Sequence, residues 1–282
     1  MTTLIIFLIL SVGLSGLFTF LICRVTGPWM AWISVLFIPV IFVILTFLSI
    51  VFVAIYSRIT TSKKRYVLKP NRFIIALMHE LDFCLMVMLN VSWRVKGYYK
   101  IPKKGKFALI CNHRSNFDQM ILISALKQKN QPLVCISKPS NFKMPLAGPI
   151  IRKAGYIPIN RENAVEGVKS IYHGADLLKN QVANVNICPE GTRNKDKNVD
   201  LLPFHQGSFK LATLAKVPIV VVCLKKTDEI HKRTPIRHTR VDVDVLETIY
   251  PEQYEGMSDK ELCDYVYSLI KDDYHQENKF LL

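Results

Sequence analysis

A histidine and an aspartate five residues apart could act as a catalytic base and the group that orients it. His113 and Asp118 lie in the segment 112–119, which follows a short apolar run. In such a pair the imidazole takes a proton from a hydroxyl, while the carboxylate fixes the ring tautomer and stabilises the imidazolium. Ser115 and Asp118 also fit a capping box, in which Asp118 satisfies backbone donors at the start of a helix. The two roles are compatible, and the spacing alone does not choose between them.

Two further segments place charged groups beside turns. Arg161 ends the run Gly-Tyr-Ile-Pro-Ile-Asn-Arg at 155–161, directly before a helical pattern that runs to about Leu178. A helix amino terminus favours an anion and the planar guanidinium suits phosphate, although an exposed loop arginine would give the same pattern. Residues 189–193 read Pro-Glu-Gly-Thr-Arg after an apolar strand. Their glycine permits a tight turn at the strand end where α/β folds bind ligands.

Together these segments resemble the motif blocks of one enzyme family. His113 with Asp118, residues 155–161, residues 189–193 and the Val-Pro-Ile of 217–219 occur in the order and approximate spacing of the four blocks of the glycerolipid acyltransferases. The chain looks like their 1-acylglycerol-3-phosphate O-acyltransferase branch, over roughly residues 95–225. One departure is at 221–222, two valines where relatives often have a second proline. This difference concerns only the local shape of a strand.

The resemblance implies roles for particular residues. His113 would be the general base and Asp118 its orienting partner. The group that would bind phosphate and glycerol is Arg161, Glu190, Gly191 and Arg193. Pro218 would form part of the wall of an acyl pocket. Further substrate contacts are expected from Asn112, Ser115, Lys138 and Thr192.

The resemblance also implies a reaction. A fatty acyl group would pass from acyl-CoA or acyl carrier protein to the sn-2 hydroxyl of 1-acylglycerol-3-phosphate (lysophosphatidic acid), forming phosphatidic acid in phospholipid biosynthesis. No acyl-enzyme, bound cofactor, metal or nucleic-acid partner is expected. The alternatives are acylation of glycerol-3-phosphate or another lysophospholipid, a thioesterase that uses Cys111 or Cys188, and a non-catalytic binder of anionic lipid. The seven cysteines are scattered singly, which indicates buried thiols rather than disulfides or a zinc site.

The amino-terminal sequence predicts a membrane anchor. Two uncharged, mostly apolar runs, 3–23 and 29–56, each reach the roughly 20 residues that span a bilayer's hydrocarbon core. The first run lacks the basic leader and cleavage site of a signal peptide. Arg24 lies between the runs, whereas a basic cluster follows the second: Arg58, Lys63, Lys64, Arg65 and Lys69. This bias predicts both termini and the catalytic part in the cytoplasm, with a monotopic hairpin as the alternative. The formal net charge of +15 suits an anionic membrane surface or a phosphorylated substrate.

The remaining sequence predicts the scaffold for these residues, an α/β fold with a largely parallel central sheet flanked by helices. Five apolar runs predict strands at 107–111, 133–137, 185–188, 219–224 and 241–246. Helices are expected to begin near Asn116, Pro145, Asn163, Gly207 and Ser258. The last strand alternates valine and aspartate, which predicts an edge strand with one wet face. Residues 72–93 are expected to be helical and to lie on the bilayer or beneath the core.

This organisation divides the chain into four parts. They are an anchor at 1–60, a basic and amphipathic interfacial helical segment at 61–96, the α/β acyltransferase domain at 97–270 and a polar tail at 271–282. The anchor suits an enzyme with lipid substrates, because extracting an acyl chain into water costs about 0.8 kcal/mol per CH₂.

Overall fold

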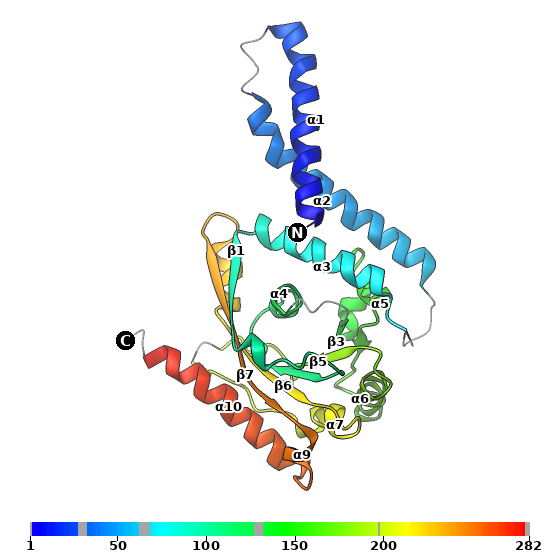
Figure 1. Ribbon diagram of the computed structural model, residues 1–282, viewed down its shortest axis with the longest axis vertical. Helices are drawn as coiled ribbons and strands as arrows, with labels where there is room; N and C mark the ends of the chain where they lie inside the picture. The colour runs from blue at the N-terminus through cyan, green and yellow to red at the C-terminus, as the bar shows by residue number, and fades with distance from the viewer. Residues whose placement is uncertain are drawn as a thin grey trace.

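A seven-stranded mixed sheet forms the centre of the protein (Figure 1). The computed structural model describes residues 2–27, 33–61, 67, 69–126, 132–196 and 198–279. The sheet order is β1-β7-β6-β2-β5-β3-β4, and every neighbouring pair is parallel except β6 and β7. The strands are β1 (Val91–Lys96), β2 (Ala108–Cys111), β3 (Leu133–Ser137), β4 (Ile157–Pro158), β5 (Asn184–Ile187), β6 (Ile219–Lys225) and β7 (Thr239–Ile249). The predicted α/β class with a largely parallel sheet is confirmed.

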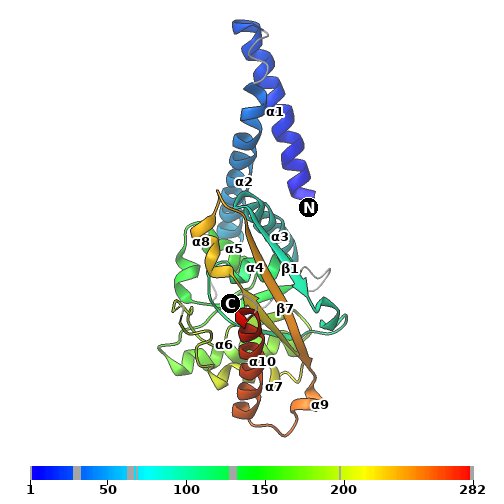
Figure 2. The same ribbon diagram turned by 90° about the vertical axis from the view of Figure 1, so that its left-hand side faces the viewer.

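Helices cover both faces of this sheet (Figures 1 and 2). The longer ones are α1 (Thr2–Thr26), α2 (Ile33–Thr60), α3 (Arg72–Met88), α4 (Asp118–Ala125), α5 (Ala147–Lys153), α6 (Ala164–Lys179) and α10 (Asp259–Lys279). Single turns are α7 (Lys210–Thr213), α8 (Ile230–Arg233), α9 (Pro251–Tyr254), η2 (Tyr98–Lys100), η3 (Pro139–Lys143), η4 (Gln206–Ser208) and η5 (Thr227–Glu229). α3 and α4 pack against β1, α6 against β5, and α10 against β6 and β7. Every residue of β2, β3, β5 and β6 is buried because helices cover the central strands on both sides.

The segment 72–93 is helical only as far as Met88. α3 begins after Asn71, whose side-chain oxygen accepts a hydrogen bond from the backbone N–H of Ile74 at 3.0 Å. Asn90 has a left-handed φ of 55° and turns the chain out of the helix. Residues 91–96 then pair with β7 as an edge strand, so the prediction of a helical segment reaching residue 96 is wrong there. β-Branched and aromatic residues in this stretch suit a strand better than a helix.

β7 is an internal strand, which corrects the prediction of an edge with a wet face. It lies between β1 and β6, and Asp242 and Asp244 are each only 3% exposed. Arg94 Nε lies 2.9 Å from Asp242, and Lys225 Nζ lies 3.1 Å from Asp244. The alternating carboxylates are therefore paired with cations inside the fold rather than hydrated.

α1 and α2 form an apolar hairpin that projects from the α/β domain (Figure 1). The stretches Ile5–Thr26 and Leu36–Thr60 are long and apolar enough to cross a membrane, and 17% of the residues in the most apolar window of each are buried. A core helix would be mostly buried, so this exposure suggests association with a membrane. The inner end of α2 packs on α3 and α5, and Lys153 Nζ donates to the carbonyl of Thr60 at 2.8 Å. The predicted basic residues Lys63, Lys64 and Arg65 lie outside the described residues.

Candidate active site

His113 and Asp118 form a hydrogen-bonded pair in the loop between β2 and α4. His113 Nδ1 lies 2.8 Å from Asp118 Oδ2, and the same oxygen accepts from the backbone N–H groups of Arg114 and Ser115, each at 2.8 Å. Asp118 is fully buried, whereas 19% of the His113 side chain is exposed. An ionised Asp118 keeps the ring proton on Nδ1 and leaves Nε2 as a proton acceptor. The pair has the geometry of a base and its orienting carboxylate.

The capping-box interpretation of the same residues is half realised. Asp118 accepts the N–H of Ser115, as a capping box requires. The Ser115 hydroxyl instead accepts from the N–H of Phe117, at 3.3 Å, and α4 has no side-chain cap at its first turn. One carboxylate oxygen therefore organises the loop and orients the imidazole at once.

The turn after β5 holds the backbone of His113 from both sides. Glu190 accepts the N–H of His113 through Oε1 and the N–H of Leu202 through Oε2, the latter at 3.0 Å. The N–H of Asn194 donates to the His113 carbonyl at 2.8 Å. Glu190 is 3% exposed, and burial raises its pKa to about 7. Both of its oxygens are occupied by backbone donors, so the structure does not offer this carboxylate to a substrate.

A polar cavity of about 250 Å³ lies over the carboxyl ends of β2, β3 and β5. Its lining includes His113, Lys138, Arg161, Thr192 and Arg193, all of which the sequence predicted. Because parallel strands end at the same edge of a sheet, segments up to 80 residues apart meet there. Three cations thus surround the space that the imidazole faces. Asn116, Gln119, Ser140 and Asn141 also line it, and no sequence signal marked them as site residues.

Five of the residues predicted to contact substrate do not line this cavity: Asn112, Ser115, Glu190, Gly191 and Pro218. The Asn112 amide is fully buried, accepts from the N–H of Leu224 at 2.7 Å and donates to its carbonyl at 2.8 Å, so it joins β2 to β6. Ser115 is 1% exposed and holds the loop. Pro218 lies beside Ala108 at the amino end of β6, whereas His113 follows the carboxyl end of the parallel strand β2. Partners distant in sequence thus place these three residues, like Glu190, outside the polar cavity, and their contacts with substrate stay predictions.

Gly191 has a conformational rather than a binding role in the described contacts. Its φ is 72°, and a Cβ built there would lie 2.8 Å from the His205 ring. Its N–H donates to the carbonyl of Cys188 at 3.2 Å. A side chain at this position would therefore displace the turn that holds His113.

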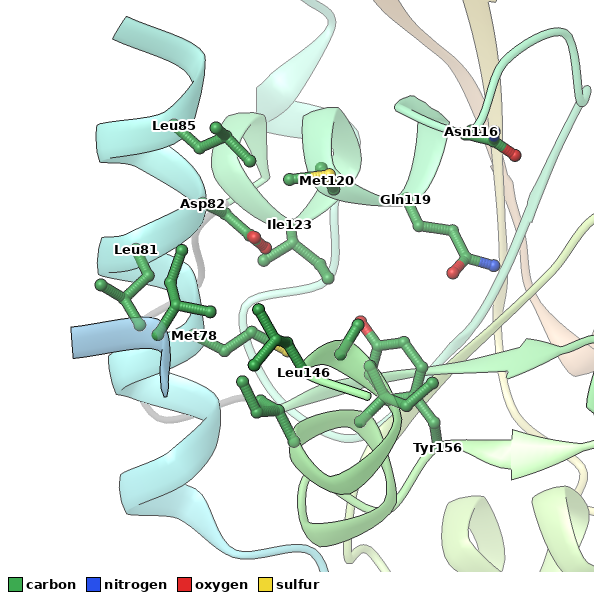
Figure 3. A pocket seen from close by; sticks show the side chains of 14 residues that line it. Met78, Leu81, Asp82, Leu85, Asn116, Gln119, Met120, Ile123, Leu146 and Tyr156 are labelled. Carbon is green, nitrogen blue, oxygen red and sulfur yellow. The ribbon is translucent and has the colours of Figure 1, made fainter. Parts of the chain in front are cut away.

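An apolar cavity of about 300 Å³ adjoins the polar one on the side of the hairpin. Asn116 and Gln119 line both, and the remaining walls come from α2, α3, α4, α5 and Tyr156. Figure 3 shows the Asp82 carboxyl beside Ile123, between α3 and α4. Burial raises the pKa of Asp82 to about 7, and the structure gives it no hydrogen bond within the described residues. The sequence marked Asp82 only as a polar interruption of an apolar segment.

A third cavity, of about 400 Å³, adjoins the polar one from another direction and is called here the α6–α7 cavity. Its lining comes from the start of α6, from η4 and α7, and from the turn after β5. Ile136, Arg161 and Cys188 line both this cavity and the polar one. The site therefore has three adjoining compartments, one polar and two flanking it.

The two cysteines near the site are poorly placed as nucleophiles. Cys111 and Cys188 lie with their sulfurs 3.5 Å apart, and both are buried. The hydrogen bond to Cys111 and burial hold the pKa of Cys188 well above its ordinary value, which disfavours a thiolate. No group of three potential metal ligands occurs among the described residues.

Comparisons with known proteins agree with this architecture. Residues 92–225 match the family model described as Acyltransferase. The chain is 26% identical over 171 residues to 1-acyl-sn-glycerol-3-phosphate acyltransferase alpha from Mus musculus, covering 61% of this chain and 58% of that protein. It is 28% identical over 167 residues to 1-acyl-sn-glycerol-3-phosphate acyltransferase from Escherichia coli (strain K12), covering 59% and 66%. The match thus spans about three fifths of the length of these curated relatives.

One solved structure shares the fold. The crystal structure of the 1-acyl-sn-glycerophosphate (LPA) acyltransferase PlsC from Thermotoga maritima superposes with a TM-score of 0.58 at 22% identity, covering 83% of this chain and 95% of that one. This similarity concerns the fold, while the family match over residues 92–225 covers the motif blocks found in the sequence.

Proposed function

Starting from a domain that matches the acyltransferase family across residues 92–225, we propose that this protein transfers a fatty acyl group to the sn-2 hydroxyl of 1-acylglycerol-3-phosphate. The donor is an acyl thioester, acyl-CoA or acyl carrier protein, and the product is phosphatidic acid. The observation that carries the proposal is the His113–Asp118 pair, 2.8 Å apart, beside a cavity that three cations line. The names of the curated relatives support the choice of acceptor.

The chemistry needs one base and no covalent intermediate. His113 Nε2 takes the proton of the acceptor hydroxyl while that oxygen attacks the thioester carbonyl. The tetrahedral intermediate then collapses, the C–S bond breaks, and the imidazolium returns the proton to the departing thiolate. Asp118 stabilises the imidazolium and holds the ring in the required tautomer.

The acceptor's phosphate binds among the cations of the polar cavity. Arg161 and Arg193 offer planar forks that match phosphate oxygens, and Lys138 adds a third positive charge. Thr192 contributes a hydroxyl to the same wall. The number of cations supports a phosphorylated acceptor over a neutral one.

The acyl chain of the donor occupies the apolar cavity. Asn116 and Gln119 line both this cavity and the polar one, and its lining also includes Ile50 of the hairpin helix α2. An alkyl chain entering here leaves water, which is worth about 0.8 kcal/mol for each CH₂ buried. Because Ile50 belongs to α2, this cavity lies beside the apolar hairpin, which suits a site for an alkyl chain.

The test is a transfer assay on the purified chain in lipid vesicles. Both thioester donors are crossed with lysophosphatidic acid, glycerol-3-phosphate and lysophosphatidylcholine, and phosphatidic acid is measured. His113→Ala should lower kcat by at least about 10². Arg161→Ala should mainly raise KM for the acceptor if its contact is equal in the ground and transition states. Full activity of His113→Ala would refute the assignment, and preference for another acceptor would replace lysophosphatidic acid.

A further inference from the structure

The α6–α7 cavity has no part in the transfer chemistry proposed above. It is lined by Asn160 and Arg161 before α6, by Val168 and Tyr172 on α6, and by residues of η4 and α7. α6 and α7 lie on the side of the domain away from the α1–α2 hairpin (Figures 1 and 2). The cavity adjoins the polar cavity, since Ile136, Arg161 and Cys188 line both. It therefore lies on a second side of the site, at a distance from the hairpin.

A thioester donor needs space on two sides of the catalytic base. Its carbonyl must lie at the base, and from that carbon the acyl chain and the thiol carrier extend in different directions. The apolar cavity beside α2 suits the chain. Resting on the proposed function, we infer that the α6–α7 cavity binds the pantetheine arm that carries the thiol in both acyl-CoA and acyl carrier protein.

The lining fits that arm chemically. In both carriers this arm is 4′-phosphopantetheine, which alternates short methylene segments with amides and ends in a phosphate. The walls are largely apolar, with Val168 and Ile171 on α6, and the side chains of Gln206 and Ser208 supply hydrogen-bonding groups among them. An amphiphilic, uncharged chain is the kind of ligand that such a mixed wall binds.

A cation at the margin of the cavity matches the phosphate end. Lys210 lines the cavity, and its side chain is 55% exposed. Asp259 lies 4.0 Å from Lys210 Nζ, a distance at which an exposed pair is weak and leaves the lysine available. A cation at the margin and apolar walls within agree with a phosphate that stays near solvent while the arm enters.

A membrane lipid is the less suitable occupant. The lining of the α6–α7 cavity contains no residue of α1, α2 or α3, whereas the apolar cavity includes residues of both α2 and α3. An acceptor chain placed there would have to leave the bilayer and pass His113. A water-soluble carrier can approach the same opening directly.

Gly207 allows the cavity to be narrowed without disturbing the fold. It lines the cavity, and a Cβ built there meets no heavy atom within 4 Å. Gly207→Leu would therefore extend into open space. Lys210→Ser removes the marginal cation, and Lys260→Ser on α10 is the matched control because Lys260 is exposed and outside the cavity.

The experiment measures transfer to lysophosphatidic acid by the full chain in phosphatidylcholine vesicles with three donors. Acyl-CoA and acyl carrier protein contain the arm, and the S-acyl ester of 2-mercaptoethanol lacks it. Gly207→Leu should raise KM for the arm-bearing donors about tenfold while changing KM for the short ester and for lysophosphatidic acid less than about twofold. Lys260→Ser should match the parent protein. Use of one arm-bearing donor alone identifies the source of the arm.

Other outcomes overturn the inference. Equal effects of Gly207→Leu on all three donors, or a raised KM for lysophosphatidic acid alone, would assign the cavity to something other than the arm. If Gly207→Leu is inactive with every donor, inhibition by 4′-phosphopantetheine tests the inference instead. This compound should compete with acyl-CoA in the parent protein, and its inhibition should weaken about tenfold in Lys210→Ser. Unchanged inhibition in Lys210→Ser refutes the inference. Absence of transfer by the parent from any donor would instead refute the proposed function.

Discussion

At the scale of single residues, the site depends on a backbone that is held as firmly as its side chains. The N–H of His113 donates to Glu190 and its carbonyl accepts from Asn194, while Asp118 fixes the ring. Glu190 and Asp118 therefore act on the imidazole from two directions. We interpret Glu190 as a positioning residue, although the motif block in which it lies suggested contact with the acceptor.

Glu190→Gln should lower kcat without raising KM for the acceptor. A glutamine has one carbonyl oxygen for the two N–H groups that the carboxylate now accepts, so either His113 or Leu202 loses its bond. Small misplacement of a catalytic group can cost about 10² in rate. The control is Asp196→Asn, the same chemical change at an exposed position of the following loop. A raised acceptor KM at constant kcat would return Glu190 to the substrate site.

Asp82 should make the stability of the protein depend on pH. Its pKa is about 7 when folded against an ordinary value of 3.8, so between those values the folded protein holds a proton that the unfolded chain has released. The free energy of unfolding should fall by up to about 1.4 kcal/mol per pH unit as pH rises from about 4 to 7, and it should be level above pH 7. The fall should be smaller than this limit because the Asp82 side chain is partly exposed to the cavity.

The measurement compares the parent and Asp82→Asn by thermal unfolding in detergent at pH 5 and pH 8. The variant should gain Tm relative to the parent at pH 8, where the parent carries the cost of a buried carboxylate, and less at pH 5. Glu190 contributes with the same sign in both proteins, so only the difference between them is informative. Identical pH dependence would show that Asp82 does not titrate in this range.

At the scale of elements, α10 is attached to the sheet through a buried charge. Lys225 of β6 lies 3.1 Å from Asp244 of β7 and 2.7 Å from Asp273 of α10, and its side chain is 7% exposed. Burial alone would lower the pKa of Lys225, but the two carboxylates raise it above its ordinary value. The lysine is therefore charged and joins three elements that are distant in sequence.

Lys225→Met should destabilise the fold by about 3–5 kcal/mol, because it leaves two carboxylates without their shared cation. Thermal or urea unfolding measures the loss. Lys232→Met is the comparison, since its pair with Asp228 is 4.0 Å long on a side chain that is 53% exposed, and such pairs contribute about 1 kcal/mol or less. Equal losses for the two variants would show that the buried network contributes no more than a surface pair.

At the scale of the whole molecule, the apolar hairpin lies beside the apolar cavity of the site. α2 runs from the hairpin into the wall of the apolar cavity through Ile50. The apolar compartment of the site therefore lies next to the hairpin, while α6 and α7 lie on the side of the domain away from it (Figure 1). This arrangement suits an enzyme with one substrate in the membrane and one in water.

Cysteine labelling in intact cells tests how the hairpin lies in the membrane. In a Cys23→Ser background, Val25→Cys (Val25 is 87% exposed) should react with an impermeant maleimide from outside. Lys260→Cys should react only after permeabilisation, because the positive-inside bias predicts a cytoplasmic domain. Protection of both sites in intact cells would indicate a hairpin that does not cross. Labelling of Lys260→Cys from outside would reverse the orientation.

The sequence by itself determined the α/β class, the five central strands, the apolar hairpin and the combination of His113, Asp118 and the cations. Those features follow from local apolar runs and from short motifs, which a chain carries whatever its long-range partners are. The strand at 91–96 escaped prediction because it is stable only beside β7. For the same reason the alternating aspartates of β7 suggested an exposed edge.

Only the tertiary structure decided which of the motif residues face the cavity. Asn112, Ser115 and Glu190 lie within two residues of groups that do, yet their polar atoms are taken by Leu224, Phe117, His113 and Leu202. The three compartments likewise arise between elements that meet only in the folded protein. Hydrogen-bond partners and cavities are long-range properties, because they depend on elements that are distant in sequence.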